Sequence, residues 1–332
     1  MHPFVLERPR DLSAALSFGA QAGRNDAPVE YIAGGTDMVQ LLQEYVRRPD
    51  RLVSLAGVLD DGIEIGSQGL RLGAAATMAE VATHQAVVER FPLISQALLN
   101  SASPQVRNQA TMGGNLLQRT RCPYFRDVGY EACNKRAPGS GCAALDGENR
   151  WHAVLGTSDD CIAVHPSDLA VALVALDASV EIRGAGGDRS VPLSDLHRLP
   201  RDTPHLETVL EPGEVITAIT VPANAAGLRS HYLKVRDRAS FEFAVVAAAV
   251  AIEMDGARIR QARVALGGVG TKPWRLPNVE AALAGAEFEP AALRQAAALA
   301  AEGTQGRGHN DFKIELMQRA IVRAVEIAGA RA

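Results

Sequence analysis

A strand that runs into a glycine turn lies near the amino terminus, where residues 29–37 read VEYIAGGTD. The apolar residues predict a buried strand, and helical spacing resumes over residues 38–46. Paired glycines let backbone N–H groups approach a phosphate, and the N-terminus of the next helix favours negative charge. A glycine turn followed by a capping Thr36 or Asp37 is equally common as a purely structural feature, so both interpretations stay open here.

A second turn of the same chemistry occurs at residues 111–115, which read TMGGN. It combines small residues with the hydroxyl of Thr111 and the amide of Asn115, both of which can hold phosphate oxygens. Two such loops in one chain favour a dinucleotide bound across them. The sequence contains neither GxGxxG nor GxxxxGK[ST], so the phosphate binder is neither a Rossmann fingerprint nor a P-loop.

All four cysteines fall within residues 119–161, which are rich in Pro and Gly and show no sustained periodicity. Loops of that length are uncommon in compact domains unless something binds in them. The spacings C-x10-C, C-x8-C and C-x18-C lack the close pairs typical of structural zinc, although zinc, two disulfides and a [4Fe–4S] cluster all remain open. Residues 119–136 carry five basic and two acidic side chains, and we expect this basic excess to offset the negative charge of a cluster.

Composition excludes several classes of protein. The chain has 332 residues, 47% of them hydrophobic and 22% charged, which is typical of a folded protein with two or three domains. Its net charge of −4 offers no basic surplus for nucleic acid. The longest apolar runs, residues 169–176 and 244–252, are too short to span a membrane and predict buried elements. The first residues, MHPFVLERPRD, do not resemble a secretory signal.

Periodicity predicts the remaining elements. We expect helices over 11–21, 77–91, 92–101, 278–302 and 311–330, short hairpin strands over 52–76, a helix followed by a strand from residue 168, and a strand ending at Pro222. A linker of small residues over 224–227 precedes three antiparallel strands with a turn at Asp255-Gly256.

Two further signals concern single residues. Asp168, in the motif HPSDLA, could hold a ribose hydroxyl, although Ser167 or Asp168 could equally cap a helix. Lys234 shares a strand face with Arg236 and Arg238 by the two-residue period, which predicts either positive charge near a flavin or a solvated face. The eight histidines are scattered, and we find no catalytic triad, HExxH or paired-carboxylate pattern. The chain therefore reads as a cofactor holder.

The order of six motifs resembles that of a known family. AGGTD, RNQATMGGNL, HPSDLA, EVITAITVP, YLKVRDRAS and GGVGTKPWR follow one another as in the FAD-binding medium subunits of the molybdenum hydroxylases, which include xanthine dehydrogenase and carbon monoxide dehydrogenase. The resemblance implies an α+β chain. It implies a two-lobed FAD-binding domain of the vanillyl-alcohol-oxidase type at 1–222, with lobes 1–56 and 57–222. A C-terminal domain with a three-stranded antiparallel sheet and helices would follow at 223–332.

The resemblance also assigns cofactor contacts. It places Asp168 at the ribitol or ribose, Ile216 at the edge of the flavin ring and Lys234 near the isoalloxazine or its phosphate. It adds Ser103 and Gln118, the latter where many relatives have Thr. Another departure is Glu242, where many relatives have the acid of an R-x-x-D motif. The residues assigned to the pyrophosphate are Ile32, Ala33, Gly34, Gly35, Thr36, Asp37, Thr111, Gly114 and Asn115.

An insertion distinguishes this chain from most of that family. Asn115 and Ser167 lie 52 positions apart, where most relatives have a handful, and the excess at about 119–163 contains every cysteine. The insertion resembles those of the periplasmic aldehyde oxidoreductases and the 4-hydroxybenzoyl-CoA reductases. That likeness implies a [4Fe–4S] cluster on Cys122, Cys133, Cys142 and Cys161.

The expected function follows from this branch of the family. The chain would transfer electrons in a heterotrimeric molybdenum-dependent aldehyde oxidoreductase, with a large molybdopterin subunit, a small [2Fe–2S] subunit and an external electron acceptor. The alternatives are the same subunit of a 4-hydroxybenzoyl-CoA reductase-like enzyme, or a non-catalytic scaffold with a zinc or disulfide staple. The resemblance implies a periplasmic location, reached by export with a signal-bearing partner, and a cytoplasmic enzyme is the alternative.

Overall fold

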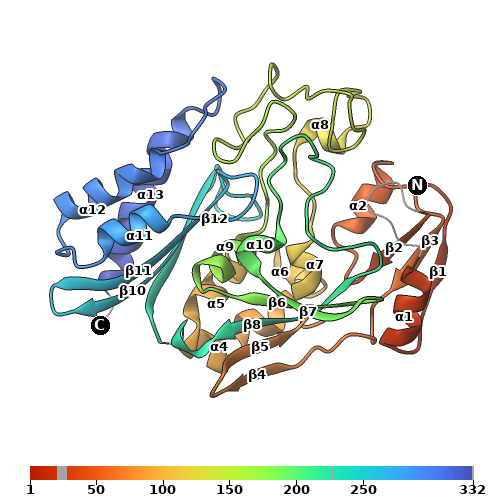
Figure 1. The fold of residues 1–332 in the computed structure, drawn as a ribbon, viewed down its shortest axis with the longest axis horizontal. Helices are drawn as coiled ribbons and strands as arrows, with labels where there is room; N and C mark the ends of the chain where they lie inside the picture. Colours follow the sequence, from red (N-terminus) through yellow and green to blue (C-terminus); the bar gives the residue numbers. More distant parts are fainter. Residues whose placement is uncertain (21–27, 226, 331–332) are drawn as a thin grey trace.

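The computed structural model describes residues 1–20, 28–225 and 227–330. The end of the helix expected over 11–21 and one position of the linker expected over 224–227 lie outside these residues. Figure 1 shows a small amino-terminal lobe, a central sheet with its helices, a C-terminal sheet with its own helices, and a loop region that rises above all three. The predicted α+β class is confirmed.

The amino-terminal lobe is a small parallel sheet with strand order β1-β3-β2. Helix α1 begins after Asp11, whose side chain accepts a hydrogen bond of 2.8 Å from the backbone N–H of Ala14. The helix expected over 38–46 ends at Gln43, and Tyr45 then adopts a left-handed backbone with φ +57°. The elements of the lobe are β1 (Val5–Glu7), α1 (Leu12–Gly19), β2 (Val29–Ile32), α2 (Met38–Gln43) and β3 (Arg51–Ser54).

The central sheet is antiparallel, with strand order β4-β5-β8-β6-β7. Strand β8, the strand expected to end at Pro222, lies in its middle, and the predicted hairpin forms β4 and β5. The strands are β4 (Ile63–Gly66), β5 (Gly69–Gly73), β6 (Ser179–Gly184), β7 (Gly187–Pro192) and β8 (Val215–Pro222).

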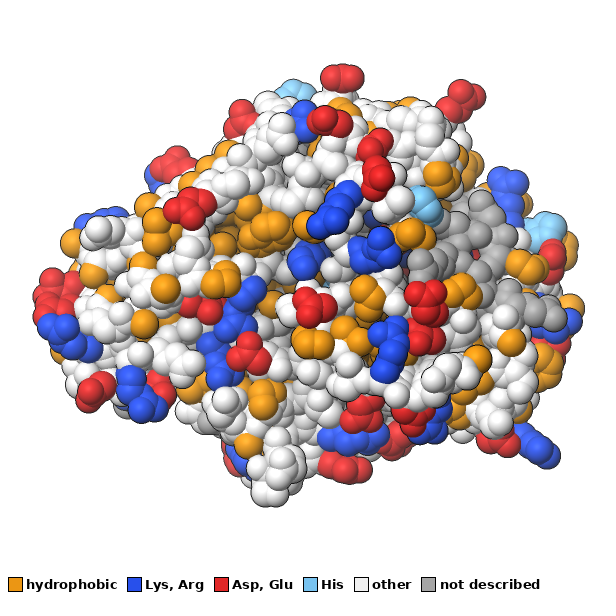
Figure 2. Space-filling model, in the orientation of Figure 1, with side chains coloured by type: hydrophobic (Ala, Val, Ile, Leu, Met, Phe, Trp, Pro, Cys, Tyr) orange, Lys and Arg blue, Asp and Glu red, His pale blue; other side chains and the backbone are white. Residues whose placement is uncertain are grey.

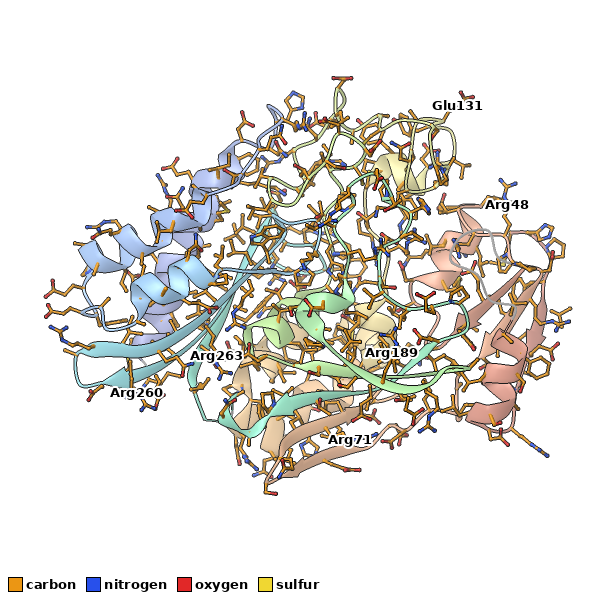
Figure 3. All side chains as sticks on the ribbon, in the orientation of Figure 1. Arg48, Arg71, Glu131, Arg189, Arg260 and Arg263 are labelled. Carbon is orange, nitrogen blue, oxygen red and sulfur yellow. The ribbon has the colours of Figure 1, made fainter. Side chains whose placement is uncertain are left out.

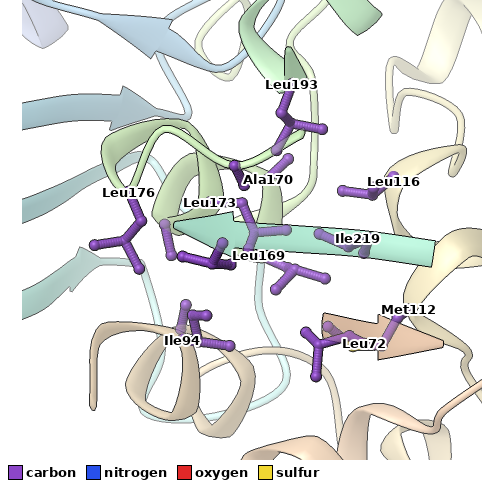
Figure 4. Packing of buried hydrophobic residues seen from close by; sticks show 14 of the residues in the cluster. Leu72, Ile94, Met112, Leu116, Leu169, Ala170, Leu173, Leu176, Leu193 and Ile219 are labelled. Carbon is purple, nitrogen blue, oxygen red and sulfur yellow. The ribbon is translucent and has the colours of Figure 1, made fainter. Parts of the chain in front are cut away.

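Helices cover one face of this sheet, and one of them is buried on every side. All residues of α9 (Asp168–Ala175) are buried, as its apolar run predicts. Figure 4 shows Leu169 and Leu173 of α9 among Leu72, Ile94 and Ile219, which belong to the same core. The remaining helices are α3 (Met78–Thr83), α4 (Gln85–Arg90), α5 (Pro92–Leu99), α6 (Pro104–Arg107), α7 (Met112–Leu116) and α10 (Leu193–Leu196). The prediction of one helix over 77–91 is wrong, because His84 has an extended backbone that separates α3 from α4.

The C-terminal domain has a sheet of order β12-β11-β10-β9, so a short edge strand joins the three expected ones. Alternate residues of β10 enter two different cores. Ala247, Ala249 and Ala251 pack with α9, whereas Val250 and Ile252 face the C-terminal helices. Small side chains on the first face allow α9 to approach closely. The strands are β9 (Arg229–Val235), β10 (Val246–Asp255), β11 (Arg258–Gly267) and β12 (Trp274–Arg275), and the short η1 (Ala223–Ala225) precedes them.

Three α-helices, rather than the two expected, cover the outer face of this sheet (Figure 1). The helix predicted over 278–302 is interrupted at Gly285, which adopts φ +79° and reverses the chain. These helices are α11 (Pro277–Leu283), α12 (Pro290–Ala298) and α13 (Phe312–Gly329), with the short η2 (Leu299–Ala301) after α12. Among the described residues, no helix is both long enough and apolar enough to cross a bilayer.

The cysteine-containing insertion is irregular, as predicted, apart from α8 (Pro123–Arg126) and isolated bridges such as Cys133 with Cys142. Its outer edge carries the exposed Glu131 (Figure 3). Its second half joins the C-terminal domain. Val154 and Leu155 lie in the C-terminal core, and their N–H groups donate to Val269 O at 2.8 and 3.0 Å. The insertion therefore packs against both domains.

Candidate functional site

One large cavity, of about 560 Å³, lies between the amino-terminal lobe, the central sheet, the insertion and the C-terminal sheet. This volume is within the usual range for sites that enclose an organic ligand, about 300–1,000 Å³. All but one of the predicted cofactor residues line it, and the exception is Ser103. Figure 2 shows basic and acidic side chains interspersed across the middle of the face drawn there.

The first glycine loop offers unpaired donors to this cavity. It leaves β2 at Ile32 and enters α2 after Asp37, and residues 32–37 all line the cavity. Gly35 has φ +73°, a conformation that other residues adopt at a cost. Among the described residues, no protein group accepts a hydrogen bond from the N–H groups of Gly34, Gly35 and Thr36. Such a run of free amides is suited to an anion.

The second glycine loop has the opposite character, because its amides are bonded within the protein. The N–H groups of Met112 and Gly113 donate to Ala76 O and Ala74 O at 2.9 and 3.0 Å. That of Gly114 donates to Thr111 Oγ1 at 3.2 Å. The second loop therefore contributes to the cavity mainly through its small side chains, which leave room for a ligand. Its Asn115 is anchored, since Asn115 Oδ1 accepts a hydrogen bond of 2.6 Å from Ser167 Oγ across the whole insertion.

Asp37 fastens the insertion to the first glycine loop. Its Oδ2 accepts a hydrogen bond of 2.8 Å from the backbone N–H of Arg119, and its Oδ1 pairs with Arg121 at 3.1 Å and with Arg126 at 2.7 Å. All three partners belong to the insertion. The carboxylate that sequence comparison assigns to the pyrophosphate is thus engaged by this loop.

Asp168 and Lys234 form a buried pair at another wall. Lys234 Nζ lies 2.7 Å from Asp168 Oδ2, and its side chain is 1% exposed. Asp168 also accepts hydrogen bonds from Tyr232 and Ser101, at 2.6 and 2.9 Å. Burial, followed by the nearby Asp168 charge, raises the pKa of Tyr232 well above its ordinary value. Ser167 caps α9, so Asp168 is free for this network.

The other predicted contacts differ in position. Ile216 lies on β8, is buried and lines the cavity. Gln118 also lines it, with its Nε2 donating to Asn115 O at 3.1 Å. Ser103 instead caps α6 by accepting a hydrogen bond from Val106 N, while its neighbours Ser101 and Ala102 line the cavity.

The four cysteines line a second, smaller cavity within the insertion. All four are free thiols. Burial raises the pKa of Cys122 to about 12 and that of Cys161 to about 11, so both thiols remain protonated unless a cation replaces the proton. Within the described part of the chain, no group of three His, Cys, Asp or Glu side chains converges on a point where a single metal ion could sit.

The basic residues of the insertion also have a structural role. Arg119 and Lys135 pair with Glu207, and Arg121 and Arg126 pair with Asp37. Arg136 donates to the carbonyls of Tyr124 and Phe125, at 2.8 and 2.9 Å. Four of the five basic side chains therefore share two carboxylates outside the insertion, and these ion pairs help to fix the loop in place.

A wall containing Lys135, Cys161 and Ala163 borders both cavities. Lys135 is buried, and its Nζ contacts Glu207 Oε1 at 2.8 Å and Pro204 O at 2.9 Å. The negative charge of Glu207 keeps the pKa of Lys135 raised despite burial. One fixed positive charge thus lies between the two cavities.

Sequence reasoning missed several residues of the site. Tyr232 lies two positions before Lys234 on β9, so the two-residue period could have found it. Glu207 carried no local signal, since it is 72 positions from Lys135. Arg236 and Arg238 both lie beyond the end of β9 at Val235, so the predicted strand face ends at Lys234. Arg236 still donates to the carbonyl of Asn100 at 3.2 Å, as Lys234 does at 3.1 Å, whereas Arg238 donates to Phe241 O.

Comparison with known proteins gives a consistent result. The family described as the FAD binding domain in molybdopterin dehydrogenase matches residues 2–224, and the CO dehydrogenase flavoprotein C-terminal domain matches residues 231–328. The chain is 46% identical to the aldehyde oxidoreductase FAD-binding subunit PaoB of Escherichia coli K12, over the full length of both. It is 26% identical to the carbon monoxide dehydrogenase medium chain of Afipia carboxidovorans, covering 99% of this chain and 98% of that one.

Solved structures agree. A Cu,Mo-CO dehydrogenase in its cyanide-inactivated form has a chain that superposes with a TM-score of 0.76 at 25% identity, with complete coverage of both chains. Quinoline 2-oxidoreductase from Pseudomonas putida 86 gives a TM-score of 0.75 at 25% identity, covering 99% of this chain and 98% of that one. The chain therefore belongs to the FAD-binding subunits of the molybdenum hydroxylases, a family of oxidoreductases.

Proposed function

We propose that this chain is the FAD- and [4Fe–4S]-binding electron-transfer subunit of a heterotrimeric, molybdenum-dependent aldehyde oxidoreductase. A large molybdopterin subunit would oxidise the aldehyde to a carboxylate, and a small [2Fe–2S] subunit would pass the electrons to this chain, which delivers them to an external acceptor. The full-length identity to an aldehyde oxidoreductase FAD-binding subunit supports this choice. Bound FAD supplies the exchange between two-electron and one-electron transfer.

The large cavity fits FAD. The free amides of Gly34, Gly35 and Thr36 would hold the pyrophosphate, because a run of backbone N–H groups binds an anion without burying a counter-charge. The buried Ile216 would exclude water from the flavin ring. Lys234, held by Asp168, would keep a positive charge beside the ring or its phosphate.

The single observation that carries the iron–sulfur assignment is the convergence of all four cysteines on one small cavity. The four ligands of a [4Fe–4S] cluster bind four different irons, so their sulfurs surround a volume instead of meeting at a point. That arrangement agrees with free thiols that share a cavity and build no single-ion site among the described residues. The same two facts disfavour a disulfide or zinc staple.

The shared wall supports electron exchange between the two cofactors. Cys161 would bind iron from one side of this wall while its other side borders the flavin cavity. Lys135, in the same wall, would stabilise added negative charge on either cofactor. The chain thus holds both groups in one electrostatic environment.

The test is the metal and flavin content of the purified complex. We expect one FAD and about four irons beyond those of the small subunit. Cys133→Ser should remove the extra iron and leave the flavin, because Cys133 lines only the smaller cavity. Ala137→Ser, an exposed position of the same loop, is the matched control.

Three outcomes would contradict the proposal. Unchanged iron in Cys133→Ser would refute the ligand assignment, and a complex without flavin absorbance would favour the scaffold alternative. Reduction of an aromatic acyl-CoA thioester, in place of aldehyde oxidation, would identify the 4-hydroxybenzoyl-CoA reductase-like enzyme.

We also propose a periplasmic location by export with a signal-bearing small subunit. Aldehyde-oxidising activity confined to the cytoplasmic fraction would contradict this location.

A further inference from the structure

A buried histidine touches one of the four thiols. The imidazole Nε2 of His152 lies 3.2 Å from Cys122 Sγ, and the residue is 3% exposed. His152 belongs to the second half of the insertion, 30 positions after Cys122. The contact is within hydrogen-bonding distance for a sulfur partner.

The second ring nitrogen decides which way the hydrogen bond runs. Nδ1 of His152 is buried and has no partner among the described residues. If the thiol of Cys122 donated to Nε2, the ring proton would sit on Nδ1 as a buried donor without an acceptor, which costs about 1–3 kcal/mol. A proton on Nε2 avoids this, since bare acceptors are tolerated better than orphaned N–H groups. The structure thus favours N–H donation towards the sulfur of Cys122, and a thiolate accepts such a hydrogen bond more strongly than a thiol does.

A cysteine bound to iron is deprotonated. Resting on the iron–sulfur site proposed above, we propose that His152 donates a hydrogen bond from Nε2 to the iron-bound sulfur of Cys122 and thereby raises the midpoint potential of the cluster. Reduction adds negative charge to the cluster and its sulfurs, and a hydrogen bond to sulfur stabilises that charge. His152 is a positioning and tuning residue, and the four thiols remain the ligands.

The surroundings hold this ring in place. Its backbone N–H donates to Asn149 O at 2.9 Å. Asn310, which is fully buried in the C-terminal domain, donates to Ala153 O at 2.9 Å. The C-terminal domain thereby holds the imidazole against the cysteine site.

The experiment compares three variants of the complete complex. His152→Phe removes the donor and keeps a planar ring, whereas His152→Gln places an amide N–H near the position of Nε2. His309→Phe is the control, because its side chain is 60% exposed in the structure. For each variant, we would measure iron and FAD content, the electron paramagnetic resonance signal of the reduced extra cluster, and its midpoint potential by redox titration.

We expect His152→Phe to retain the extra iron, with a lower midpoint potential and an altered resonance signal. His152→Gln should lie between that variant and the unmodified complex, and His309→Phe should match the unmodified complex. An unchanged potential and signal in His152→Phe would overturn the inference. So would loss of iron equal to that in Cys133→Ser, because His152 would then be a ligand or a structural support. An unmodified complex without the extra iron would instead refute the proposed function itself.

Discussion

Asp37 illustrates how one carboxylate can join two parts of a molecule. It ends the first glycine loop and receives a backbone N–H and two guanidinium groups from the insertion. The side chains of Arg121 and Arg126 are 26% and 14% exposed, so much of their charge is shielded from water. Removing a carboxylate from such a site leaves two cations facing one another. The insertion is therefore held to the first glycine loop by charge.

Asp37→Asn should loosen the insertion, although the side-chain oxygen of the asparagine can still accept the hydrogen bond from the backbone N–H of Arg119. We expect a loss of about 2 kcal/mol in stability, typical of hydrogen bonds to charged groups, together with partial loss of the extra iron. Iron content and thermal unfolding of the complex measure the two effects. Asp146→Asn, at an exposed position in the same insertion, should change neither quantity. Equal behaviour of the two variants would show that Asp37 does not anchor the loop.

At the scale of elements, the two glycine loops meet backbone to backbone. A β-carbon added to Gly34 would lie 1.8 Å from the carbonyl oxygen of Gln109, two positions before the second loop. Backbone cannot move aside as a flexible side chain can, so this contact sets the distance between the loops. The close approach of the two loops, which line the large cavity, therefore requires the absence of a side chain at Gly34.

Gly34→Ala should separate the loops and weaken FAD binding by at least about tenfold, the equivalent of 1.4 kcal/mol. Flavin content per complex and titration of the apoprotein with FAD would measure the loss. Gly66→Ala is the matched control, because a β-carbon there meets nothing within 4 Å. Full flavin occupancy in Gly34→Ala would show that the loops can separate without cost.

The periodicity of apolar residues predicted helices and strands well where one face is buried, but it predicted the ends of helices less well. The alternation in β8 and β10 and the apolar run of α9 were read correctly, since each pattern reports local burial. The divisions at His84 and Gly285 were missed, because each depends on the backbone of a single residue. The two-residue β12 was missed because it exists only by pairing with β11.

At the scale of the whole molecule, β10 lies between two cores, and the insertion spans both domains. Lys313, at the start of α13, is completely buried behind this junction, with its Nζ donating to Gly268 O at 2.7 Å. Burial lowers its pKa from 10.5 to about 7. The folded chain therefore binds fewer protons than the unfolded chain between these two pH values. The contribution of Lys313 to stability should therefore rise with pH across that window and be most unfavourable below pH 7.

Lys313→Met removes this cost, so the variant should be more stable than the unmodified complex at pH 6.5. Its advantage should shrink by about 1 kcal/mol per pH unit above pH 7, and reverse at high pH as the lost hydrogen bond to Gly268 dominates. Denaturant unfolding at pH 6.5, 8 and 9.5 tests this. Arg319→Met, on an exposed face of the same helix, should show no such pH dependence. A constant difference across the three pH values would contradict the buried, depressed pKa.

The sequence by itself determined the family, the α+β class, the two glycine loops and the clustering of four cysteines, because each is a local pattern or an order of motifs. All but one of the cofactor-contact residues that it predicted line the large cavity. The tertiary structure alone brought Glu207 to Lys135, Asp37 to Arg126 and His152 to Cys122, across separations of 72, 89 and 30 positions. The physical reason is that periodicity records what each residue buries locally, whereas charges and thiols select partners through space, and only the folded chain fixes those distances.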